Sequence, residues 1–211
     1  MKFDSINHLR KKYRTMGSFY KVDGLWFRNY ADVIKIDYDS SCIDCYIVMM
    51  NPGSCKPKDK NKPLGATSPE TAILTEVKCD RAQKRVMQLM DNTEYKKYRI
   101  LNLIDYKEPD SNKAISFTKE HHNYLISIFS PEREEELNAV TKYNSPFILA
   151  YGVGDKLNSY KKLVNEFVKD KKIYGIKKED TDLGYYYLSP PKENDARKVL
   201  TQIVNQVTDL K

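Results

Sequence analysis

Four short, mostly apolar runs occur along the chain, and longer segments with a helical pattern separate them. The runs cover residues 43–50, 98–106, 145–154 and 182–191. They are nearly continuous rather than alternating, which is typical of strands covered on both faces. Strands that alternate with helices predict a parallel sheet between two helical layers. We therefore expect an α/β fold with a short four-stranded parallel sheet.

The segments between these runs repeat their apolar residues with a helical period. In the last of them, Ala196, Val199, Leu200 and Ile203 share one face. The predicted helices lie at about 70–91, within 117–142 with a break near Ser130-Pro131, at about 157–168 and at about 196–208.

The first forty residues have a different pattern. Aromatic and polar groups alternate through residues 13–40, and Asp23-Gly24 stands between two β-rich flanks. An Asp-Gly pair in that setting is a strong hairpin signal. We expect an antiparallel β-hairpin at about 18–37, at an edge of the sheet, within a single domain of 211 residues.

Polar or turn-forming residues follow each predicted parallel strand. In open α/β sheets, ligands bind beyond the carboxyl ends of the strands. The sequence therefore predicts a site at these exits. The residues concerned are Asn51-Pro52-Gly53, Asn102 to Asp105, Tyr151-Gly152 and Leu188 to Pro191.

Composition narrows the choice of partner. The formal net charge is +7 and the pI is about 9.0. That balance favours a polyanion such as DNA, although a lysine-rich solvated surface has the same signature. No apolar run is long enough to cross a membrane, and the first residues lack the apolar core of a signal peptide. We expect a cytoplasmic protein without a membrane partner.

The four cysteines do not indicate a metal site. Cys42 and Cys45 have the spacing of a redox or metal motif, but at a strand entrance their side chains point to opposite faces. We interpret them as buried free thiols. No metal or organic cofactor is expected.

Four motifs together resemble the uracil-DNA glycosylase superfamily. They are "MMNPG", "ILNLIDY", "FILAYG" and "YLSPP", in that order. Their order and spacing, over about residues 13–191, are also similar to a bacterial and phage family called domain of unknown function 1643. The resemblance implies a three-layer α/β/α fold and, less directly, glycosylase activity. The chain departs from the superfamily at its last motif, where Tyr187 or Leu188 stands in place of a usual histidine.

Cleavage of an N-glycosidic bond needs a positioned water and a pocket for the base. Asn51 is the candidate that positions the water, and Asp105 is a second catalytic candidate that activates it. Alternatively, Asn51 belongs to an ordinary turn and Asp105 caps a turn or helix.

Base recognition is assigned to residues at the same strand exits. Asn102 reads a base edge, Pro52 and Gly53 shape a turn, and aromatic rings stack on the base. Asn102 also suits a buried structural role, and the tyrosines also suit a core. The base-binding candidates are Asn102, Tyr106, Tyr151, Pro52 and Gly53.

Contacts to the DNA backbone are assigned to two loops. The first follows Asn-Pro-Gly and carries four lysines, a pattern also found in solvated surface loops. The second is the stiff "SPPK" segment, which also suits a strand exit before a helix. The DNA-binding candidates are Lys56, Lys58, Lys60, Lys62, Ser189, Pro190 and Lys192.

Three functions are consistent with these assignments. The first is a DNA glycosylase that releases an abnormal or modified base. The second is a nucleic-acid-binding protein that has the fold without the chemistry, as the missing histidine suggests. The third is a hydrolase or transferase that acts on free nucleotides or nucleosides.

Overall fold

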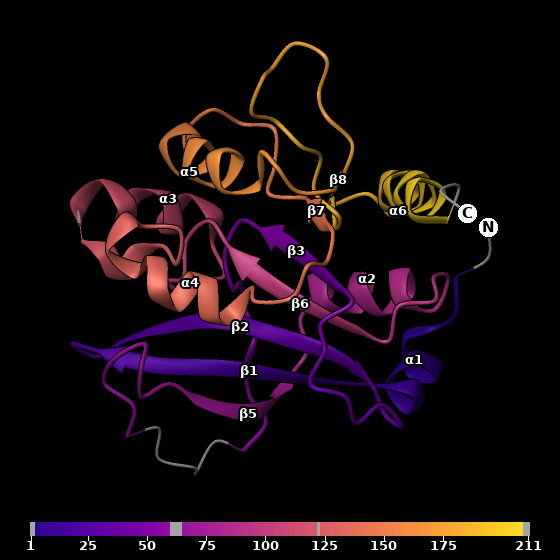
Figure 1. Ribbon diagram of the computed structural model, residues 1–211, viewed down its shortest axis with the longest axis horizontal. Coiled ribbons are helices and arrows are strands. Elements are labelled where there is room, and N and C mark those ends of the chain that lie inside the picture. Colours follow the sequence, from indigo (N-terminus) through magenta and orange to yellow (C-terminus); the bar gives the residue numbers. More distant parts are fainter. Residues whose placement is uncertain (1–2, 60–64, 122, 209–211) are drawn as a thin grey trace.

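A computed structural model describes residues 3–59, 65–121 and 123–208. Its centre is a mixed sheet of eight strands in the order β4-β5-β1-β2-β6-β3-β7-β8 (Figure 1). The strands are β1 (Tyr13–Val22), β2 (Leu25–Lys35), β3 (Cys45–Met49), β4 (Lys56–Pro57), β5 (Ile73–Lys78), β6 (Lys97–Asn102), β7 (Phe147–Leu149) and β8 (Ile173–Tyr174). The helices are α1 (Ile6–Lys12), α2 (Arg81–Met90), α3 (Ser111–Glu120), α4 (Glu134–Val140), α5 (Asn158–Val168) and α6 (Glu193–Thr208), with 3₁₀ turns η1 (Tyr124–Ile126) and η2 (Pro131–Arg133).

The predicted α/β class is confirmed, but the sheet is larger than expected. Strands β6, β3, β7 and β8 run parallel and form one half of it. The predicted fourth strand at 182–191 is wrong, because β8 takes that place. In the predicted segment Tyr185 makes only isolated bridges, while Tyr186 and Tyr187 remain exposed. Tyrosine counts as apolar in a sequence pattern, yet it leaves its ring edge and hydroxyl near water.

The predicted hairpin is confirmed, and its predicted place at an edge is wrong. Asp23 and Gly24 both have positive φ, as a tight hairpin turn between β1 and β2 requires. However, β1 pairs with β5 and β2 pairs with β6, so the hairpin lies inside the sheet. The predicted helix at 70–91 is correct only from Arg81 onward. Residues Ile73–Lys78 form β5, where exposed and buried side chains alternate.

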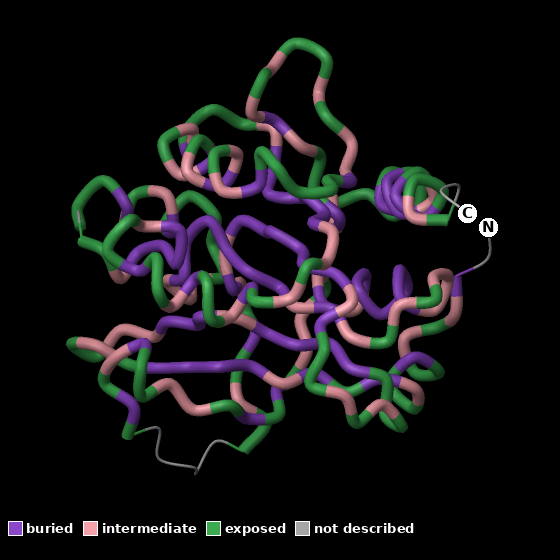
Figure 2. Tube along the Cα trace, viewed as in Figure 1, coloured by how far each residue is buried: buried purple, intermediate pink, exposed green. Residues whose placement is uncertain are grey.

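Helices cover both faces of the parallel half. Successive residues of β3 point to opposite sides: Ile47 packs with α2 and α6, whereas Val48 packs with α3, α4 and α5. Figure 2 shows that these strands are largely buried, that α2 is mostly buried as well, and that the other helices have both buried and exposed residues. Along the described ranges, no helix is both long and apolar enough to cross a membrane.

One of the expected buried thiols is in fact exposed. Cys45 is buried at the start of β3, but Cys42 lies in the preceding loop, where the chain has not yet entered the sheet. In the part of the chain that the structure describes, no cluster of histidine, cysteine and acidic side chains could hold a metal ion.

Candidate functional site

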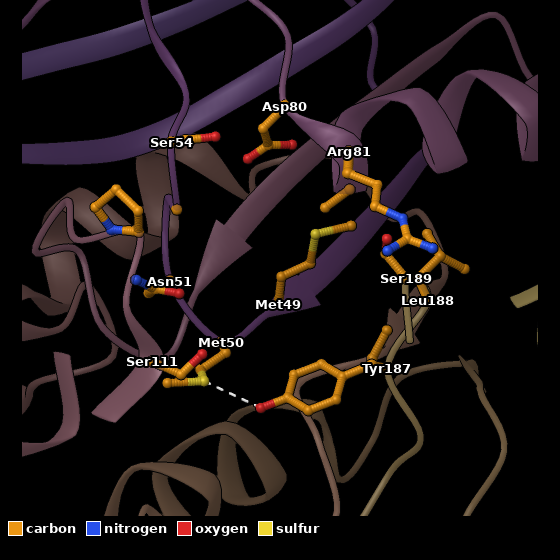
Figure 3. Close-up of a pocket in the computed structure, with 14 residues that line it drawn as sticks. Met49, Met50, Asn51, Ser54, Asp80, Arg81, Ser111, Tyr187, Leu188 and Ser189 are labelled. Carbon is orange, nitrogen blue, oxygen red and sulfur yellow. Dashed lines mark hydrogen bonds between the residues drawn. The ribbon is translucent and has the colours of Figure 1, made fainter. Parts of the chain in front are cut away.

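A cavity of about 280 Å³ opens at the carboxyl end of β3. Met49, Met50 and Ala150 give it apolar surface from the ends of β3 and β7. Polar side chains come from four other segments, namely the loop after β3, the start of α2, the start of α3 and the loop before α6 (Figure 3). Parallel strands end at the same side of a sheet, so this is where the sequence predicts a site.

Asn51 is held in a defined orientation at this cavity. Its Nδ2 donates a hydrogen bond of 2.6 Å to the carbonyl oxygen of Glu108, in the loop after β6. That bond turns the amide oxygen toward the cavity and the nitrogen away from it (Figure 3). The carbonyl oxygen of an amide accepts hydrogen bonds. Asn51 therefore presents an anchored acceptor to whatever occupies the cavity.

The turn after Asn51 brings the chain close to α2. The N–H of Cys55 donates to the carbonyl of Pro52 at 3.3 Å, and Gly53 has a φ of +61°. A Cβ at Gly53 would lie 3.2 Å from Oδ2 of Asp80. Glycine thus serves both the positive φ and the close approach. Gly53 lines the cavity, whereas Pro52 is buried behind it.

Asp80 adds a carboxylate to the cavity wall. It caps α2: its Oδ1 accepts from the N–H of Gln83 at 2.9 Å, and Oε1 of Gln83 accepts from the N–H of Asp80 at 3.0 Å. This reciprocal pair fixes the carboxylate, and Oδ2 lies on the side of Gly53. The Asp-x-x-Gln spacing was a sequence signal for the cap, although it did not indicate a site.

Tyr187 forms an aromatic wall of the cavity. Its ring sits over Gly152, where an added Cβ would come within 2.4 Å of the ring. Its hydroxyl donates to Sδ of Met50 at 3.0 Å, a weak acceptor. Although Tyr187 as a whole is 40% exposed, its hydroxyl is partly buried against Met50. This burial raises the pKa of the hydroxyl above its usual range, so it stays protonated at neutral pH. The aromatic side chain of the site therefore carries a protonated hydroxyl.

Serine and arginine complete the rim. Ser189 lines the cavity, and its Oγ is buried without a hydrogen-bond partner among the described residues. Arg81, at the start of α2, is exposed and donates to the carbonyl of Pro191 at 2.8 Å. Pro190 and Lys192, the other candidates of this loop, are not part of the cavity lining.

The two polar candidates from the β6 exit lie outside the cavity. Asn102 is fully buried, and its Oδ1 accepts from Nη2 of Arg28 at 3.0 Å. Asp105 is also fully buried, and its Oδ2 accepts from Nη1 of Arg133 at 2.6 Å. The N–H of Arg28 donates to the carbonyl of Asp105 at 2.9 Å, so β2 covers this exit. These two side chains occupy an internal polar network rather than the cavity.

Two predicted stacking residues belong to the core. The Tyr106 ring stacks on Phe117 with the ring centroids 3.9 Å apart. Tyr151 is buried, and its hydroxyl donates to Oδ1 of Asn165 at 3.0 Å. Neither ring lines the cavity.

The lysine loop forms part of the opposite sheet edge. Lys56 begins the short strand β4, and Lys58 pairs with Glu76 of β5 at 2.7 Å. Neither of them lines the cavity. Lys60 and Lys62 lie outside the described residues.

Asp105 gives the fold a testable pH dependence. Burial raises the pKa of this carboxyl to about 8, and the Arg133 guanidinium opposes the rise. The folded protein then holds a proton that the unfolded chain, with its ordinary pKa near 3.8, releases. This contribution is complete below pH 4 and is lost as the pH rises toward 8. We expect the free energy of unfolding to fall over that window in the wild type and less steeply in Asp105→Asn. Urea denaturation at a series of pH values measures the difference, and parallel curves would contradict the assignment.

Comparisons of this chain with protein-family models, with curated proteins and with solved structures find no match.

Proposed function

We propose that the protein hydrolyses the N-glycosidic bond of an abnormal or modified base in DNA. The observation that carries this proposal is the anchored amide of Asn51, whose oxygen faces a cavity also lined by the Asp80 carboxylate and the Tyr187 ring. The motif resemblance described above supports the same activity. The net charge of +7 agrees with a polyanionic substrate.

The chemistry assigns one role to each of these groups. A water held by the Asn51 oxygen attacks the anomeric carbon of the sugar as the carbon–nitrogen bond breaks. The bonding electron pair leaves with the base, and the proton of the water passes to Asp80. The base, extruded from its strand, lies against Tyr187.

Tyr187 takes the part for which the superfamily uses histidine. Negative charge develops on the departing base, and a hydrogen-bond donor aimed at it stabilises the transition state. The Tyr187 hydroxyl is protonated, and its present acceptor is a thioether, which it gives up at little cost. The missing histidine therefore does not exclude catalysis.

The cavity volume limits the ligand. At about 280 Å³ it lies just below the usual range for small-molecule sites, which suits a single base better than a whole nucleotide. This favours an extruded base over the free-nucleotide alternative, in which sugar and phosphate also need room.

A panel of oligonucleotides tests the proposal. Each carries one modified or abnormal base, and hot alkali after incubation breaks the strand at every abasic site. We expect breaks with at least one base, together with the free base in the supernatant by mass spectrometry. Salt-sensitive binding without abasic sites would support the non-catalytic alternative. Release of bases from mononucleotides alone would support the third.

Tyr187 separates base stacking from hydrogen-bond donation. Tyr187→Phe keeps the ring and removes the donor, so we expect kcat to fall about a hundredfold with little change in binding. Tyr187→Ala removes both, and it weakens binding of the substrate by a further 1–3 kcal/mol, roughly the value of one stacked base. Single-turnover kinetics and fluorescence anisotropy give the two quantities. Tyr186→Phe is the matched control, because Tyr186 is exposed and does not line the cavity. Equal single-turnover rates for Tyr187→Phe and the wild type would show that the Tyr187 hydroxyl does not stabilise the departing base.

A further inference from the structure

A second cavity, of about 450 Å³, adjoins the first one along α2. It lies where the segment leading into α1, helix α2 and the start of α6 come together, on the side of the molecule where Figure 1 places these three helices. Arg81 lines both cavities. The two hollows are therefore neighbours that share one side chain at their boundary.

Basic side chains dominate this second cavity. Four cationic groups line it, against two carboxylates, those of Asp4 and Glu193. Asp4 is already engaged by Lys12, with 3.0 Å between Nζ and Oδ2. The cationic groups are Arg81, Lys84, Arg85 and Arg197.

The internal pairing leaves hydrogen-bonding capacity unused. Glu193 is shared, because it accepts from Nη1 of Arg85 at 3.2 Å, from Nη2 of Arg85 and from Nε of Arg197 at 3.2 Å. Nη1 of Arg85 also donates to Gln88 at 2.8 Å, which leaves Nε as its unused donor. Arg85 is only 5% exposed, and within the described ranges its Nε has no hydrogen-bond partner. No ion pair in the described part of the chain involves Lys84 or Arg81. A buried donor without a partner costs free energy, so a ligand that supplies an acceptor is favoured.

We propose that these four residues, the α2–α6 basic groove, bind phosphates of the DNA strand whose base enters the first cavity. This inference rests on the proposed function. An arginine fork matches phosphate oxygens, and a lysine adds a point charge. Arg81 lines both the cavity proposed for the base and the groove proposed for the phosphates. One DNA strand that occupies both sites has to pass this residue. Lys58 of the lysine loop is paired with Glu76, whereas Lys84 and Arg81 of the groove make no ion pair in the described part of the chain.

Two double variants with the same charge change test this groove. Lys84→Gln/Arg197→Gln removes two groove charges. Lys162→Gln/Lys198→Gln removes two exposed charges that line neither cavity, one of them adjacent to Arg197 in the sequence. Binding of a fluorescent single-stranded oligodeoxynucleotide without any modified base is measured over a salt series, with circular dichroism as the check on folding.

The salt dependence is the decisive quantity. Each lost phosphate contact reduces the slope of log K against log salt by about 0.7 for a single strand. We expect the groove variant to lose about 1.4 in slope and roughly tenfold or more in affinity, and the control variant to match the wild type. Equal slopes in both variants, or no binding by the wild type, would overturn the groove. The probe has no modified base, so this result does not depend on base release. If binding depends on the groove but no base is released from the oligonucleotide panel, the groove stands and only the proposed glycosylase activity is contradicted.

Discussion

Replacement of Asn51 by alanine is expected to lower kcat for base release about a hundredfold, with the affinity for the oligonucleotide nearly unchanged. The amide oxygen positions the attacking water, and it makes no contribution to holding the strand. The Nδ2 bond of 2.6 Å to Glu108 is what keeps that oxygen in place. Asn51→Asp keeps an acceptor but loses the N–H that the Glu108 carbonyl needs, so we expect it to be impaired as well.

The control for this change is another asparagine. Asn92 donates through Nδ2 to the carbonyl of Gln88 at 2.9 Å, at the end of α2 and outside the cavity. Asn92→Ala therefore removes the same kind of hydrogen bond at a position that does not line the cavity. Single-turnover rates of the three variants give the comparison. An Asn51→Ala rate equal to that of Asn92→Ala would assign Asn51 to the turn alone.

Replacement of Arg133 by methionine is expected to lower the free energy of unfolding by about 3–5 kcal/mol, because three acceptors in or near the core lose their donor. Arg133 is buried in η2 and joins three elements: it donates to Asp105 at 2.6 Å, to Asn29 of β2 at 3.1 Å and to Glu136 of α4 at 2.8 Å. Its loss leaves the Asp105 carboxyl and the Asn29 amide oxygen buried without this donor. For a chain of this length the change lowers Tm by about 10 °C.

An exposed arginine provides the comparison. Arg10→Met in α1 should change the unfolding free energy by less than about 0.5 kcal/mol, as is usual for surface positions. Adding Asp105→Asn to Arg133→Met should recover part of the loss, because the pair then leaves no carboxyl in the interior. Urea unfolding and thermal melts measure both. A Tm for Arg133→Met within the range of Arg10→Met would show that the network contributes little.

Much of the parallel half of the fold could be predicted from the sequence, because its strands are buried on both sides and read as apolar runs. The sequence predicted helix where β5 lies because two patterns adjoin there. The alternating pattern of Ile73–Lys78 is only six residues long, and the helical pattern of α2 follows almost directly, so the two read as one helix. The placement of the hairpin depends on which strand it pairs with, and that is long-range information. An Asp-Gly hairpin signal predicts the turn, but it does not predict which other strands pair with the hairpin.

The same long-range pairing explains which of the predicted site residues line the cavity. Asn51, Gly53 and Ser189 follow strands or loops whose exits stay open, and they meet at the cavity. Asn102 and Asp105 leave β6, which the inserted hairpin covers, so their exit is closed. Asp80, Arg81 and Tyr187 were not in the predicted site because their sequence signals, a helix cap and a tyrosine run, have ordinary structural explanations.

The central claim is that the cavity beside Asn51 holds a nucleobase. Crystals of the protein soaked with uracil and with other free bases test it most directly. We expect a base ring packed on Tyr187, in hydrogen-bond reach of the Ser189 hydroxyl, with a water between the ring and the Asn51 oxygen. Bases bound only elsewhere on the protein, with that cavity holding water alone, would contradict it.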